Sequence, residues 1–145
     1  MLNRAWIEKH IPHQGRMCLL DEVLHWDSQR IRCRTSSHRA ADNPLRSQHR
    51  LGCACGIEYA AQAMALHDAL TGGGTPEAGF LASVRDVRQF VLRLDDIESD
   101  LICEVTLVAG NDRTALYEFS LQDGARDLLT GRATVVLDAN KRSRI

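Results

Sequence analysis

The sequence predicts an α+β fold in which one antiparallel sheet curls around a single apolar helix. The stretch from Cys53 to Leu70 reads as a helix that is apolar almost all the way round, so other elements must cover it. Two strand-like segments precede this helix and four follow it. One long sheet wrapped around the helix would bury the helix and its own apolar face together.

The residues before the helix contain one short helix, two strands and a loop. Met1 to Gln14 predicts the short helix, which Pro12 ends because proline removes a backbone donor. The two strands are expected at Met17 to Trp26 and Gln29 to Ser36, joined by a turn at Asp27 and Ser28. The polar stretch from Ser37 to Gly52 is a loop that leads into the apolar helix. Its side chains are therefore delivered to the amino end of that helix.

After the helix, the run from Thr71 to Pro76 is glycine-rich and predicts a helix stop with a flexible connection. It follows a helix and meets a proline, which is the wrong context for a phosphate-binding loop. Four strands are expected, at Gly79 to Leu92, Leu101 to Val108, Thr114 to Gln122 and Asp127 to Leu137. The chain reads as one domain, residues 1–145, with its core at about 11–138 and a frayed basic tail at 139–145.

Composition excludes several classes of protein. The formal net charge of −1 gives no broad attraction to nucleic acid or to an anionic membrane, and no apolar run has the length of a membrane span. Five cysteines without a signal-peptide pattern predict free thiols in a cytoplasmic protein. Cys53 and Cys55 are one residue apart, which is not a zinc or redox spacing, so no metal is expected.

Glu58 is the first residue to explain, because a carboxylate on an apolar helix is costly to bury unless it is hydrogen-bonded or catalytic. Gln62 follows four residues later, which predicts the same helix face. A glutamate in apolar surroundings holds a proton more readily than one in water. His49 and His38, in the loop before the helix, are the candidate bases. For each of these residues, a purely structural role remains open.

Three motifs carry a family resemblance. They are Ile11-Pro12-His13 with the apolar run Met17 to Leu24, the helix segment Gly56 to Ala63, and Gly79 to Ser83. In this order they resemble the 3-hydroxyacyl-ACP dehydratases of the hotdog superfamily, and most closely the dehydratase-like proteins of aryl-polyene-type gene clusters. One departure is clear. His49 aligns with the catalytic histidine, but the Phe-Pro-Gly that follows it in the family is missing, and the loop to Glu58 is shorter.

The resemblance implies a hydro-lyase that removes water from a 3-hydroxyacyl thioester to give the 2-enoyl thioester. Glu58 would be the acid and His49, or otherwise His38, the base. The amides of Cys55 and Gly56 would face the thioester oxygen, and Gln62 would contact substrate. No cofactor is expected, because the substrate is carried on the phosphopantetheine arm of an acyl carrier protein. Arg46 and Arg50 belong to a basic edge of the loop, which would bind the phosphate of that arm or an acidic carrier protein, or would simply be a solvated charged surface.

The resemblance also implies an oligomer, because hotdog chains pair so that each site draws residues from two subunits. The expected assembly is a homodimer or higher homo-oligomer, or a hetero-oligomer with another hotdog protein. Two other functions remain open at this point. One is an acyl thioesterase, in which the acidic residue directs water onto the thioester. The other is a catalytically silent subunit that binds acyl groups or pairs with an active dehydratase, which the missing Phe-Pro-Gly favours.

Overall fold

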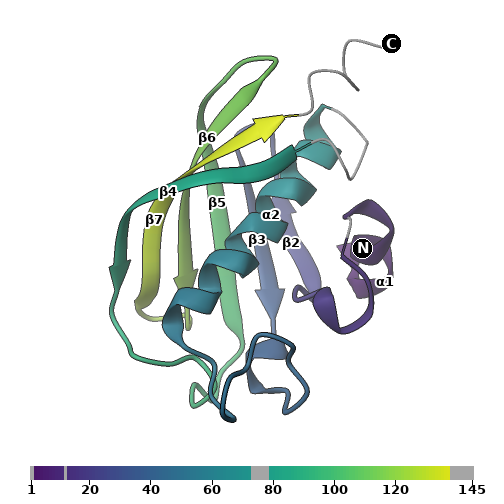
Figure 1. Ribbon diagram of the computed structural model, residues 1–145. Helices are drawn as coiled ribbons and strands as arrows, with labels where there is room; N and C mark the ends of the chain where they lie inside the picture. The colour runs from purple at the N-terminus through teal and green to yellow at the C-terminus, as the bar shows by residue number, and fades with distance from the viewer. Residues whose placement is uncertain (1, 12, 73–78, 138–145) are drawn as a thin grey trace.

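The computed structural model describes residues 2–11, 13–72 and 79–137 (Figure 1). Two α-helices are present in these ranges, α1 (Arg4–His10) and α2 (Gly56–Thr71). Short 3-10 turns lie at Gly15–Met17, Ser37–Arg39 and Cys53–Cys55, the last leading directly into α2. The strands are β1 (Leu2–Asn3), β2 (Glu22–Trp26), β3 (Arg30–Thr35), β4 (Gly79–Gln89), β5 (Leu101–Gly110), β6 (Thr114–Gln122) and β7 (Asp127–Leu137).

The strands form one antiparallel sheet in the order β1-β2-β3-β5-β6-β7-β4. Helix α2 lies across its concave face, as Figure 1 shows. The strand β4 follows α2 in the chain but pairs with β7 at the end of the sheet. The predicted α+β fold, a hotdog sheet around one helix, is confirmed.

The core forms between α2 and the inward side chains of the sheet. Tyr59, Ala63 and Leu66 of α2 are fully buried. Opposite them, alternate residues of β5 point inward, because successive side chains of a strand face opposite sides of the sheet. Cys33 and Cys103 are direct partners across β3 and β5, and both thiols are free and buried. All five cysteines are free, as predicted.

Some boundaries differ from the prediction. The first predicted strand begins five residues late, at Glu22, because residues 18–20 are buried against α2 instead of pairing in the sheet. The two-residue strand β1 was not predicted. Helix α1 agrees with the expected short helix, but Pro12, the glycine-rich connection after Gly72 and the basic tail lie outside the described residues. Within the described part of the chain, no helix has the length and apolarity needed to cross a membrane.

Candidate functional site

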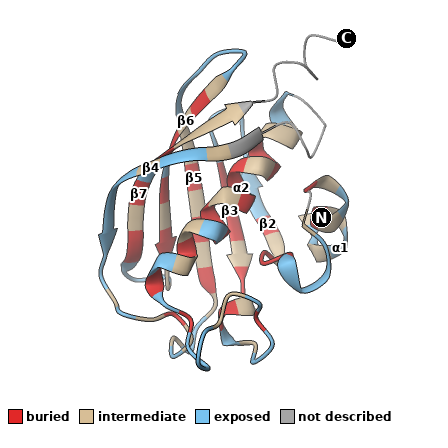
Figure 2. Cartoon of the chain, in the orientation of Figure 1, coloured by how far each residue is buried: buried red, intermediate tan, exposed pale blue. Residues whose placement is uncertain are grey.

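Glu58 lies in the first turn of α2, and its side chain is exposed. Ala61 and Ala65 share this side of the helix, and Ala54 precedes it in the 3-10 turn; all three are exposed or half-buried. Ala54, Glu58, Ala61 and Ala65 are called the outer strip below. In Figure 2, buried, intermediate and exposed residues follow one another along α2. The expectation that Glu58 is buried is wrong for the single chain, because the sheet covers only the opposite face.

Apolar side chains are also exposed beside the start of α2. Strand β4 ends the sheet, so one of its edges has no strand beside it in the described chain. Val87, Phe90 and Leu92, in and just after β4, are 37%, 53% and 92% exposed. The backbone at Leu92 is nevertheless fixed, because its carbonyl accepts a 3.1 Å hydrogen bond from the amide of Cys53. These three side chains are called the β4 patch.

His49 lies at the tip of a tight turn in the loop that precedes α2. Ser47 and Arg50 exchange two backbone hydrogen bonds of 2.8 and 3.0 Å across the turn. Gln48 and His49 between them have φ angles of 52° and 66°, the left-handed conformation of a two-residue hairpin turn. The His49 side chain is exposed. Among the described residues, no hydrogen bond or ion pair joins Glu58 to His49 or His38.

His38 is in a different environment, because its side chain is fully buried. Its Nε2 donates a 3.0 Å hydrogen bond to the carbonyl of Ile97, which ties the start of the loop to the β4–β5 connection. Its Nδ1 is buried without a hydrogen-bond partner among the described groups. Burial lowers the pKa of His38 below the usual 6.5 and favours the neutral ring. A ring enclosed in this way is not accessible to a substrate on the outer strip.

Gln62 does not share the exposed face with Glu58, contrary to the prediction. It is 1% exposed, and residues of the segment before β2 bind its amide. Its Oε1 accepts a 2.9 Å hydrogen bond from the amide of Leu19, and its Nε2 donates to the carbonyl of Met17 at 2.6 Å. These two bonds occupy both ends of the amide and fix the Met17–Leu19 segment against α2. The structure thus gives Gln62 a structural role.

Cys55 and Gly56 also differ from their predicted roles. The amide of Cys55 donates to the carbonyl of Gly52 at 3.0 Å, and the amide of Gly56 to backbone carbonyls of the same turn. A Cβ at Gly56 would lie 2.7 Å from Leu129 Cδ2 and 2.8 Å from Leu121 Cδ2. The missing side chain therefore lets the helix approach the sheet. Burial raises the pKa of the Cys55 thiol.

The two predicted phosphate-binding arginines have different surroundings. Arg46 is mostly buried, and its guanidinium donates to carbonyl groups of its own loop. Arg50 is exposed, and its side chain makes no hydrogen bond or ion pair with the described residues. Of the two, Arg50 is therefore the guanidinium available to an anionic ligand.

A buried polar network that was not predicted joins the loop to α2. The Tyr59 hydroxyl accepts a 3.0 Å hydrogen bond from Nδ2 of Asn43 and lies 2.8 Å from Oγ of Ser37. Asn43 also donates to the carbonyl of Ser37 at 2.8 Å. Tyr59 is adjacent to Glu58, so this network fixes the loop relative to the carboxylate. A tyrosine on a buried helix was the available signal, because its hydroxyl requires a partner.

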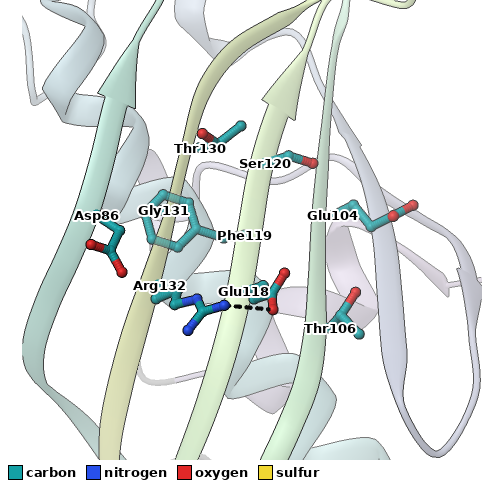
Figure 3. Close-up of a pocket in the computed structure, with 9 residues that line it drawn as sticks. All are labelled: Asp86, Glu104, Thr106, Glu118, Phe119, Ser120, Thr130, Gly131 and Arg132. Atoms are coloured by element: carbon teal, nitrogen blue, oxygen red, sulfur yellow. Dashed lines mark ion pairs between the residues drawn. The ribbon is translucent and has the colours of Figure 1, made fainter.

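A hollow of about 330 Å³ lies on the other side of the molecule (Figure 3). Its wall residues Glu104, Thr106, Glu118 and Ser120 alternate along β5 and β6 with the buried, inward-facing ones, which places the hollow on the face of the sheet away from α2. Asp86, Glu104 and Glu118 make its walls acidic, and Arg132 pairs with Glu118 at 3.5 Å. Charged walls do not suit an acyl chain. No cluster of metal-binding side chains occurs among the described residues.

Comparison with solved structures supports the fold. A chain of the dehydratase heterocomplex ApeI:P from Xenorhabdus doucetiae is similar with a TM-score of 0.78 and 23% identity over 90% of both chains. Zebrafish thioesterase superfamily member 2 is similar with a TM-score of 0.66 and 13% identity, over 94% of this chain and 99% of that one. A mutant of thioesterase PA1618 from Pseudomonas aeruginosa has a TM-score of 0.59 and 10% identity, over 80% and 79% of the two chains. At these identities the likeness shows the hotdog fold alone.

No curated protein matches the sequence. One family model does, and its description is ApeP dehydratase. The match runs from residue 5 to residue 144, so it includes most of α1, the loop, α2 and every strand from β2 to β7. The predicted resemblance to the dehydratase-like proteins of aryl-polyene type is confirmed, and the chain belongs to the ApeP-like dehydratase family.

Proposed function

We propose that this protein removes water from a 3-hydroxyacyl thioester carried on an acyl carrier protein, as one subunit of a pair of hotdog chains. The observation that carries the proposal is the position of Glu58. It is an exposed carboxylate in the first turn of α2, near the amino-terminal end of the alanine-lined outer strip. An acyl chain laid along this strip would bring its polar end to the carboxylate.

The reaction needs one acid and one base. A base takes the proton from C2, the C2–C3 double bond forms, and the C3 hydroxyl leaves as water after it receives a proton. Glu58 is the proposed acid, because its exposed carboxyl on the outer strip can contact the C3 hydroxyl of a substrate laid along α2. His49 is the proposed base, since its exposed ring can meet a substrate, whereas His38 is enclosed.

A second subunit is proposed because Glu58 and His49 make no contact within one chain. The β4 edge can accept another strand, and the β4 patch supplies apolar surface for its side chains. The partner proposed is a different hotdog chain. One observation supports this: the similar chain from Xenorhabdus doucetiae is part of a dehydratase heterocomplex.

The carrier arm would approach from the loop side, where the exposed guanidinium of Arg50 can bind its phosphate. A catalytically silent subunit is the second candidate function. The shortened loop and the buried ring of His38 favour it, because a subunit that lacks a usable base can still bind an acyl chain along the outer strip. The thioesterase alternative has only the shared fold in its favour.

The test is turnover of a 3-hydroxyacyl-ACP by the purified protein, alone and mixed with a second hotdog chain that binds it. Absorbance and mass of the product distinguish the enoyl thioester from a free acid. Enoyl product from the mixture supports the proposal. Free hydroxy acid would indicate a thioesterase. If the substrate is unchanged although a stable complex forms, the result supports the catalytically silent subunit.

A further inference from the structure

The side chain of Arg46 binds the start and the tip of the loop that carries His49. Its Nε donates to the carbonyl of Ala40 at 2.8 Å and its Nη2 to the carbonyl of His38 at 3.2 Å, both at the start of the loop. Its Nη1 donates to the carbonyl of His49 at 2.9 Å, at the tip. Three donors of one planar group thus fix the distance between the start of the loop and its tip.

The tip of the loop has a backbone conformation that its two residues do not favour. Gln48 and His49 both have positive φ, and neither is glycine, asparagine or aspartate. The left-handed conformation costs an L-residue about 1–2 kcal/mol, so it persists only where the surroundings enforce it. The hydrogen bond from Arg46 is accepted by the carbonyl of His49, the second of these two residues.

Arg46 is itself held in place from the other side. Asp95, in the β4–β5 connection, has its carboxylate 3.9 Å from Nη1 of Arg46, and only 15% and 7% of the Arg46 and Asp95 side chains are exposed. The amide of Leu51 and the guanidinium of Arg93 donate to the same carboxylate. Arg93 beside it holds the pKa of Asp95 well below its usual range, so the carboxylate stays charged.

We propose that Arg46 is a positioning residue that holds His49 in its left-handed turn and so directs its ring toward a bound substrate. Arg46 is not a phosphate ligand in this proposal, because its side chain is mostly buried and three of its donors are engaged with backbone carbonyls. The inference rests on the proposed function, in which His49 is the base. The part of the inference that concerns structure, that Arg46 holds the turn, can be measured without turnover.

The experiment compares Arg46→Lys and Arg46→Met with Arg39→Lys. Lysine keeps the charge but lacks the planar fork. Arg39 is a matched control, since it lies in the same loop and binds the carbonyl of Glu98 and the carboxylate of Asp100, but not the tip. Two properties are measured: amide hydrogen exchange at Ser47 and Arg50, whose hydrogen bonds close the turn, and kcat and KM of dehydration in the subunit complex.

Both Arg46 variants should speed exchange at these two amides by about tenfold or more. Their kcat should fall by about 10- to 100-fold at nearly unchanged KM, because a misplaced base weakens the chemical step and not substrate binding. Arg39→Lys should do neither. Arg46→Lys is the informative variant if Arg46→Met fails to fold.

Wild-type exchange rates in Arg46→Lys would overturn the inference. So would full activity in His49→Ala, which would leave no base to position. If the wild-type complex has no turnover, the proposed function fails, and exchange alone then decides whether Arg46 holds the turn.

Discussion

The Tyr59 hydroxyl, on α2, accepts a 3.0 Å hydrogen bond from the side-chain amide of Asn43 in the loop. Both groups are buried, so each would be costly to leave unpaired. The bond connects the element that carries Glu58 with the loop that carries His49. It therefore helps to fix their relative position within one chain.

Removing this hydroxyl should destabilise the protein. Tyr59→Phe leaves the donor of Asn43 with the carbonyl of Ser37 only, and we expect the free energy of unfolding to fall by about 1–3 kcal/mol. Urea denaturation of Tyr59→Phe, Asn43→Ala and the double variant measures the coupling. The losses should be less than additive, because both variants break the same bond. Strictly additive losses would show that the two groups act independently.

Gly56 should tolerate no side chain, because a Cβ there would lie within 2.8 Å of Leu121 and Leu129. Gly56→Ala pushes α2 away from the sheet, and we expect a loss of about 1–3 kcal/mol in the free energy of unfolding. Gly52→Ala is the matched control, since nothing lies within 4 Å of a Cβ at Gly52 and its φ is −64°. It should change stability by no more than about 0.5 kcal/mol. Equal stability of the two variants would contradict this packing.

Stability should fall with pH below about 6.5 because of His38 and His67. Burial lowers the pKa of both rings below the usual 6.5, so the unfolded chain takes up protons that the folded chain resists. Their contribution is complete above pH 6.5 and is lost as the pH falls toward the folded-state pKa values. Each ring changes the free energy of unfolding by at most about 1.4 kcal/mol per pH unit.

Urea denaturation between about pH 5 and pH 8 measures this slope. His38→Gln can still donate to the carbonyl of Ile97 but cannot titrate. The pH dependence of its free energy of unfolding should therefore be shallower, by the equivalent of up to one proton taken up on unfolding. His25→Gln is the control, because the His25 side chain is 61% exposed. An unchanged slope in His38→Gln would show that this ring does not contribute.

The β4 patch should control assembly and not folding. Leu92 is 92% exposed, so Leu92→Glu should leave the melting temperature of the single chain unchanged. In a complex the same residue would be buried, and a glutamate there should weaken subunit association by at least about tenfold. Val108→Glu is the matched control, since Val108 is 50% exposed on β5, which is not at the β4 edge.

Analytical ultracentrifugation of the two variants, each mixed with the partner chain, checks the prediction. Association that is equally tight in Leu92→Glu and in the unaltered chain would place the interface elsewhere.

Local patterns were sufficient to predict most of the fold. The bounds of β6 follow from the alternation of its buried residues and from clear turn residues on both sides. The segment from Met17 to Asp21 was mistaken for a strand because it is apolar. In the structure residues 18–20 are buried, and the segment is held by hydrogen bonds to Gln62, a residue more than forty positions away. Periodicity within one segment carries no information about such a contact.

The candidate site was less predictable, for a related reason. The presence of Glu58 on an apolar helix can be inferred from the residues around it, but the direction in which it points depends on how α2 packs on the sheet. The predicted substrate site includes Gly56 because its amide lies at the start of the helix, and Gln62 because the helical period places it on the face of Glu58. The packing turns them toward Leu129 and Leu19 instead.

The role of Glu58 as the acid is the central claim, and one comparison tests it most directly. Glu58→Gln keeps the size and the exposed position of the side chain but removes its ability to donate a proton to the leaving hydroxyl. Turnover of a 3-hydroxyacyl-ACP should fall by at least about a hundredfold in the complex that contains this variant, with assembly intact. Glu98→Gln, an exposed glutamate outside the outer strip, serves as the control. Activity of the Glu58→Gln complex within a fewfold of wild type would contradict the account.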